Sequence, residues 1–85
     1  MKRYFFHIFN GTGPTRDEEG QELPSLEAAR AEAVAGIRSL VADELEHGTI
    51  DLAGRIDICD RDGSVLASIP FTDVVHIRMP GEESR

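Results

Sequence analysis

The sequence predicts an α+β protein in which one long helix packs on one face of a small, mostly antiparallel sheet. Three observations predict this class: an aromatic-rich strand near the N-terminus, one long amphipathic stretch in the middle of the chain, and two alternating strands after it. The predicted order is strand, strand, helix, strand, strand (β-β-α-β-β). Because one helix covers one face of a sheet, the other face is expected to be open to water or to a partner.

The first strand is predicted over residues 3–9, which hold four of the five aromatic residues. Successive side chains of a strand point to opposite faces, so this strand presents two sets of residues. Tyr4, Phe6 and Ile8 share the face expected under the helix, and Arg3, Phe5, His7 and Phe9 share the other. A turn is predicted over residues 10–14, then a weak strand over 15–17 and a further extended segment over 21–23, as a peripheral hairpin.

The helix is predicted between Ser25 and Gly48. Serine is a favoured N-cap, Glu27 suits the positive end of the helix dipole, and glycine commonly follows a helix C-terminus. An advance of about 100° per residue gathers one wide apolar stripe for the core. Its members are Leu26, Ala29, Ala33, Val34, Ile37, Leu40, Val41 and Leu45. Gly36, near the edge of this stripe, allows close approach of the sheet.

The opposite side of the helix carries a stripe of small side chains: Ala28, Ala31, Ala35 and Ala42. Alanine is the best helix former, so an exposed alanine needs no further purpose. Small side chains also let a second helix approach closely, as in a homodimer. The sequence leaves both interpretations open.

Two strands are predicted over residues 55–59 and 65–69, joined by the loop Asp60–Gly63. A four-residue loop pairs Ile58 with Val65 and Ile56 with Ala67. It is preferred over a three-residue loop with a bulge, which shifts the pairing by one.

The end of the chain is predicted from its prolines and from one short apolar segment. Pro70 is expected to end the last strand, because proline cannot donate to a ladder. Residues 74–77 form either a short strand or one helical turn. Residues 1–79 are expected to form a single domain, and residues 80–85 a flexible C-terminal tail.

Nine basic and sixteen acidic residues give a net charge of −7. This charge disfavours nucleic acid and anionic membranes, whose phosphates it would repel. The N-terminal apolar run is too short for a signal peptide, and no stretch approaches the ~18 apolar residues of a membrane span. A cytoplasmic protein is therefore expected.

The residues that could bind a metal or take part in catalysis are not spaced as such sites require. The three histidines, at positions 7, 47 and 76, do not have the spacing of a metal site, and the single Cys59 excludes an internal disulfide. The loop after residue 59 begins as a calcium loop does, but its sixth position is Val65 and its twelfth is Phe71. No catalytic residue, cofactor or metal is predicted, and the protein is not expected to be an enzyme.

Three motifs resemble one family: the start Arg3-Tyr4-Phe5-Phe6, the turn Asp17-Glu18-Glu19-Gly20 before the alanine-rich helix, and the loop Asp60-Arg61-Asp62-Gly63. This family consists of short bacterial proteins known only as a domain of unknown function, and the resemblance runs from residue 3 to about 71. It implies no activity or cofactor. A looser resemblance to HicB-type antitoxins rests on the strand–strand–helix order and on residues 23–29.

The leading hypothesis is a small acidic, non-catalytic interaction module that self-associates or docks on a protein partner. The candidate surfaces are the strand face with Phe5, His7 and Phe9 and the alanine stripe of the helix. An aromatic strand face also suits single-stranded RNA, but the net charge opposes that interpretation. The alternatives are an antitoxin-like or inhibitor-type binder of a basic enzyme, and a small ligand-binding or enzymatic domain.

Overall fold

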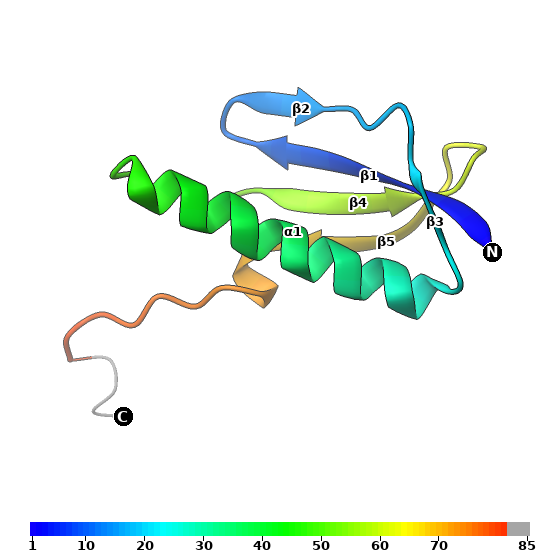
Figure 1. Ribbon diagram of the computed structural model, residues 1–85. Helices are drawn as coiled ribbons and strands as arrows, with labels where there is room; N and C mark the ends of the chain where they lie inside the picture. Colours follow the sequence, from blue (N-terminus) through cyan, green and yellow to red (C-terminus); the bar gives the residue numbers. More distant parts are fainter. Residues whose placement is uncertain (82–85) are drawn as a thin grey trace.

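The computed structural model describes residues 1–81. Its elements are β1 (Lys2–Asn10), β2 (Gly13–Thr15), β3 (Gln21–Leu23), α1 (Leu26–Glu46), β4 (Arg55–Cys59), β5 (Val65–Pro70) and the short 3-10 helix η1 (Phe71–Asp73). The α+β class is confirmed: one long helix crosses one face of an open antiparallel sheet (Figure 1). A third strand before the helix is added to the predicted order.

The sheet has the order β2-β1-β4-β5, with β3 also paired to β1. The expected hairpin between the second and third strands is wrong, because both strands pair antiparallel with β1 and not with each other. Together β2 and β3 form one edge strand that residues 16–20 interrupt. The second strand lies at 13–15 and not at 15–17, since the Asn10 side chain accepts hydrogen bonds from Thr12 and closes the turn early.

Both ends of α1 follow the predicted signals. The Ser25 hydroxyl accepts a hydrogen bond from the Ala28 amide (3.1 Å). At the other end Gly48 has a φ of +87°, and the amides of Gly48 and Thr49 donate to the carbonyls of Leu45 and Glu44. This pairing satisfies carbonyls that the helix itself leaves unbonded.

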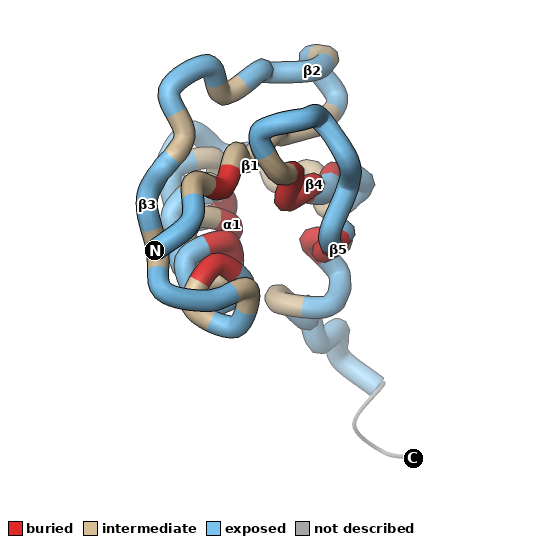
Figure 2. Tube along the Cα trace, turned by 90° about the vertical axis from the view of Figure 1, so that its right-hand side faces the viewer, coloured by how far each residue is buried: buried red, intermediate tan, exposed pale blue. Residues whose placement is uncertain are grey.

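The core lies between α1 and the sheet (Figure 2). Its buried apolar residues are Tyr4, Ala29, Ala33, Ile37, Val41, Ile56, Ile58, Ala67, Ile69 and Phe71. Two residues of the predicted set are less covered, since Phe6 and Ile8 are only half-buried. The reason is that α1 makes its main sheet contacts with β4, β5 and β3 and few with β1, so it leaves Phe6 and Ile8 incompletely covered.

One member of the predicted helix stripe lies outside the core. Leu45 is 61% exposed. The last turns of α1 extend past the ends of the strands (Figure 1), so no sheet lies beneath Leu45. The other seven positions are buried or half-buried, as predicted.

The predicted register between the last two strands is wrong by two residues. Ile58 pairs with Ala67 and Ile56 with Ile69, and Leu66 is an extra residue at a bulge. The cause is the loop, in which the Asp60 side chain accepts hydrogen bonds from the amides of residues 62 and 64 and fixes a five-residue connection. The shift of two leaves Ala67 on its predicted face, because the strand period is two, whereas the bulge turns Val65 to the other face, opposite Cys59.

The last strand ends at Pro70, as predicted, and η1 follows it at once. The expected strand or helical turn at 74–77 is therefore misplaced: the helical turn lies at 71–73, where Phe71 is buried and its amide donates to the Gly54 carbonyl. Val74 and Val75 pack against the core, and residues 76–81 are exposed. Of the expected tail over 80–85, residues 82–85 lie outside the described part of the chain.

Candidate functional site

The face of the sheet opposite α1, called the open face from here on, carries side chains from three strands. β1 contributes Phe5, His7 and Phe9, β4 contributes Arg55, Asp57 and Cys59, and β5 contributes Ser68. The strand register sets His7 opposite Asp57 and sets Asp57 opposite Ser68. Within residues 1–81 no helix covers this face, as the sequence predicted (Figure 1).

The centre of the open face is a polar network around Asp57, which is 8% exposed. Its carboxylate accepts hydrogen bonds from the Ser68 hydroxyl (2.6 Å) and from Nε of Arg55 (3.0 Å). Burial acts to raise the pKa of Asp57, but the hydrogen bonds from Ser68 and Arg55, with the charges of Arg55 and His7, outweigh it and lower the pKa. Asp57 is thus a charged, fully partnered carboxylate.

Arg55 has a second role at the edge of this network. Its guanidinium carbon lies 4.2 Å from the centre of the Phe9 ring. A cation over an aromatic face is attracted to it by about 0.5–1 kcal/mol at an exposed site. The contact leaves part of the guanidinium in solvent, with the Arg55 side chain 48% exposed.

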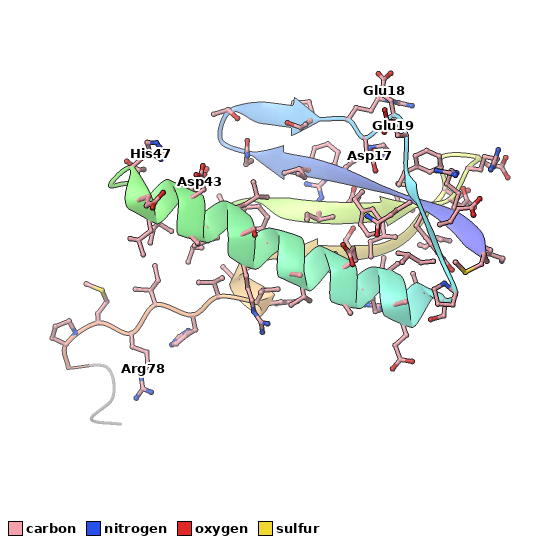
Figure 3. All side chains as sticks on the ribbon, viewed as in Figure 1. Asp17, Glu18, Glu19, Asp43, His47 and Arg78 are labelled. Atoms are coloured by element: carbon pink, nitrogen blue, oxygen red, sulfur yellow. The ribbon has the colours of Figure 1, made fainter. Side chains whose placement is uncertain are left out.

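The edge beside His7 is held by Asp17, which lies in the segment that interrupts the edge strand (Figure 3). Its carboxylate accepts hydrogen bonds from the amide of Phe6 (3.0 Å) in β1 and from the amides of Glu19 (3.2 Å) and Gly20 (3.1 Å). Burial acts to raise the pKa of Asp17, but these three bonds and the charge of His7 outweigh it and lower the pKa. The side chain thus takes the place of a strand carbonyl that the interruption removes.

The last position of the same turn, Gly20, requires glycine. Its φ is +71°, and a Cβ there would lie 2.9 Å from the Phe5 ring and from the Tyr4 carbonyl. Both the backbone conformation and the lack of space require glycine. The motif Asp17-Glu18-Glu19-Gly20 therefore fixes the edge of the sheet.

His7 lies between Asp17 and Asp57 on the open face. Its Nδ1 accepts a hydrogen bond from the Asp17 amide (3.0 Å), so the neutral ring carries its proton on Nε2. The Ser68 hydroxyl donates to Asp57 and not to His7. A histidine that accepts the proton of a serine nucleophile is therefore not assembled here.

Two adjoining hollows lie on the open face. The first, about 320 Å³, lies between the interrupting segment and the loop after β4, and is lined by Phe5, His7, Arg16, Asp17, Glu18, Asp60 and Arg61. The second, about 270 Å³, is lined by His7, Phe9, Pro14, Thr15 and Arg16. They share His7 and Arg16 and so lie next to each other; the two hollows together are called the depression along β1.

The other predicted surface residues lie apart from this site. On α1, Ala31, Ala35 and Ala42 are exposed and Ala28 is half-buried, on the side away from the sheet. The His47 ring, near Asp43 at the end of α1 (Figure 3), donates from Nδ1 to the Asp43 carbonyl (2.9 Å).

The structure also places the remaining candidates for metal and thiol chemistry. Burial raises the pKa of the Cys59 thiol, and the nearby carboxylates of Asp57 and Asp60 raise it further. Within residues 1–81 no three His, Cys, Asp or Glu side chains are placed to hold a metal ion. In the same part of the chain, no helix has the length and apolar character needed to cross a membrane.

Arg55, Asp57 and Ser68 were missed by sequence reasoning as site residues. The signal was present in the alternation of β4, which sets Asp57 on the face opposite Ile56 and Ile58. The alternation of β4 does not show which residue bonds to Asp57, because Ser68 lies beside Asp57 only in the observed register of β5.

These features define a class of small α+β proteins with one helix on one face of an antiparallel sheet and a polar, aromatic depression on the other. The chain belongs to the family described as Domain of unknown function (DUF6894), whose model matches residues 3–72. The predicted family is thereby confirmed over nearly the predicted range. No curated protein and no solved structure matches the chain, so the likeness to HicB-type antitoxins stays a prediction.

Proposed function

We propose that this protein is a non-catalytic interaction module whose open face binds a segment of a protein partner. The observation that carries the proposal is the depression along β1, where Phe5, His7 and Phe9 lie beside two adjoining hollows. Aromatic side chains that stay partly exposed on a sheet are typical of surfaces that bind another molecule.

The charges around the first hollow suit a polypeptide. Arg16 and Arg61 line it together with Asp17, Glu18 and Asp60. Such a mixture offers partners to both signs of charge along a peptide, whereas nucleic acid requires a basic surround.

The state of the two central carboxylates supports a binding role over a catalytic one. Asp17 and Asp57 each accept several hydrogen bonds, and the pKa of each is lowered. A carboxylate that is already ionised and fully bonded has no proton to give and is a weak base near neutral pH.

The proposal is tested by affinity capture with matched charge reversals. Arg61→Glu changes the rim of the first hollow, and Arg38→Glu makes the same change on the exposed side of α1. We expect a specific partner, captured from lysate and then purified, to bind the wild type and Arg38→Glu equally and to bind Arg61→Glu at least about 10-fold more weakly. Chemical-shift changes on adding the partner should centre on β1.

Equal binding by all three proteins, with shift changes away from β1, would overturn the proposal. The net charge of −7 favours a basic partner. If that partner is an enzyme and loses activity when bound, the protein acts as its inhibitor.

A further inference from the structure

A second depression lies on the helix side of the sheet, between α1 and β1. This groove has a volume of about 340 Å³ and an apolar lining of Phe6, Ile8, Ala33, Gly36, Leu40 and Ile56. It exists because α1 packs mainly over β4 and β5 and leaves Phe6 and Ile8 of β1 half-covered. Gly36 widens it further, since it places no side chain against the sheet.

The rim of the groove is acidic. Asp17, Gln21 and Glu32 line it together with the apolar residues. Two carboxylates and an amide above an apolar floor suit an occupant that combines apolar side chains with a cation.

One segment of the chain itself has this chemistry. The C-terminal arm, defined as Val75–Met79, alternates apolar residues with His76 and Arg78. Ile77 is 42% exposed, and the arm runs away from the helix and sheet with Arg78 pointing outward (Figures 1 and 3). Residues 75–81 contain no acidic residue, in a chain with sixteen.

We propose that the arm of a second copy occupies the groove, so that two copies exchange arms in a symmetric dimer. In an extended arm Ile77 and Met79 lie about 7 Å apart on one side. The wall of the groove from Ala33 to Leu40 spans about 10 Å of helix, which accommodates both. Arg78 leaves the opposite side of the arm, and its long side chain can bend to the rim and reach Glu32.

The occupant comes from another copy because of the order of the strands. The arm leaves the body after β5 and η1, whereas the groove lies at β1, on the other side of β4. With α1 packed over β4 and β5, a chain cannot lay its own arm across the core to reach its own groove. When each copy places its arm in the groove of the other, both grooves are filled and no groove is left for a third copy.

The test is the mass of the full chain by light scattering and sedimentation, from about 5 to about 200 µM. We expect wild type to reach twice the 9.4 kDa of one chain. Ile77→Glu should weaken dimerisation at least about 100-fold, because it places a charge in the apolar groove. Leu66→Glu is the matched control: Leu66 is 40% exposed on β5, away from groove and arm, and this variant should dimerise as wild type does.

A charge exchange tests the contact directly. Glu32→Arg and Arg78→Glu should each weaken the dimer about 5- to 10-fold, and the double variant should recover most of the loss. A monomeric wild type at about 200 µM would overturn the proposal, and so would a double variant no better than the singles. A dimer that Ala35→Glu dissociates and Ile77→Glu does not would place the interface on the alanine stripe and overturn it too. The open-face variant Arg61→Glu should keep the dimer mass, so this outcome is independent of the proposed function.

Discussion

At the scale of single residues, the Asp17 carboxylate supplies the hydrogen-bond acceptor that a continuous edge strand would offer to β1. The amide of Phe6 points to the edge where β2 has ended and β3 has not begun, and the Asp17 carboxylate accepts its hydrogen bond. The same carboxylate accepts two further amides, and the Asp17 amide donates to His7. An interrupted edge strand is tolerated because one side chain satisfies the groups that the interruption exposes.

Asp17→Asn tests this role. Asparagine has one acceptor oxygen, and its amide nitrogen would face a backbone N–H that also donates. The free energy of unfolding is expected to fall by about 1–3 kcal/mol. Urea unfolding measures it, with Glu18→Gln as the control that removes a neighbouring exposed carboxylate and should cost less than about 0.5 kcal/mol. Equal losses in the two variants would contradict the assigned role.

The lowered pKa values of Asp17 and Asp57 predict the pH dependence of stability. Each lies below the usual 3.8, so below neutral pH the unfolded chain binds more protons than the folded one. Their contribution is fully present above the unfolded pKa and is lost as the pH falls through the folded pKa. Stability should therefore hold between about pH 7 and 5 and decline below about pH 4.

Urea unfolding at a series of pH values measures this decline. Asp57→Asn removes one of the two carboxylates and should make the decline shallower, although it lowers stability at neutral pH. A decline of unchanged steepness in the variant would show that Asp57 does not contribute to it.

At the scale of elements, α1 is held by its apolar stripe. Ile37 is fully buried against the sheet, whereas Ala35 points to solvent from the other side of the same helix. Both positions lie in the interior of the helix, so burial against the sheet is the main difference between them.

Ile37→Asp should therefore unfold the protein. A buried, unpartnered charge costs several kcal/mol, out of a total stability of about 4–13 kcal/mol for a chain of this length. The matched variant Ala35→Asp should cost less than about 1 kcal/mol, most of it the lower helix propensity of aspartate. Thermal circular dichroism measures both, and an Ile37→Asp melting temperature within about 3 °C of wild type would show that the core face is misassigned.

At the scale of the whole molecule, the shape is more extended than a chain of this length requires. The radius of gyration is 14.3 Å over principal extents of 45 × 27 × 19 Å, against about 12 Å for a compact domain of 85 residues. The excess comes from the end of α1 and from the C-terminal arm, which both leave the sheet (Figure 1). These projecting parts carry the exposed Leu45, Ile77 and Met79.

The overall charge sets the expectation for nucleic acid. Phe5 and Phe9 lie on an open sheet face, but the net charge of −7 repels phosphates. A gel-shift assay with short single-stranded RNA near 0.1 M salt should detect no binding tighter than roughly 10⁻⁴ M. Micromolar, salt-sensitive binding that is lost in Phe5→Ala would contradict this and identify the open face as an RNA platform.

The sequence by itself determined the elements whose signals are local. The alternation of residues 3–9 set the two faces of β1, and Ser25 and Gly48 marked the ends of the helix. Each signal depends on neighbours within one turn or one strand, where the periods of 3.6 and 2 fix the direction of every side chain.

Tertiary structure alone decided where distant groups meet. Asp17 bonds to Phe6 and Ser68 to Asp57, each across eleven residues, and these contacts exist only because of strand order and register. The groove beside β1 likewise follows from where α1 settles across the sheet. Local propensity carries no information on such placements, because they depend on how whole elements pack. The free energy gained by burying apolar faces is larger than the preference of any single turn.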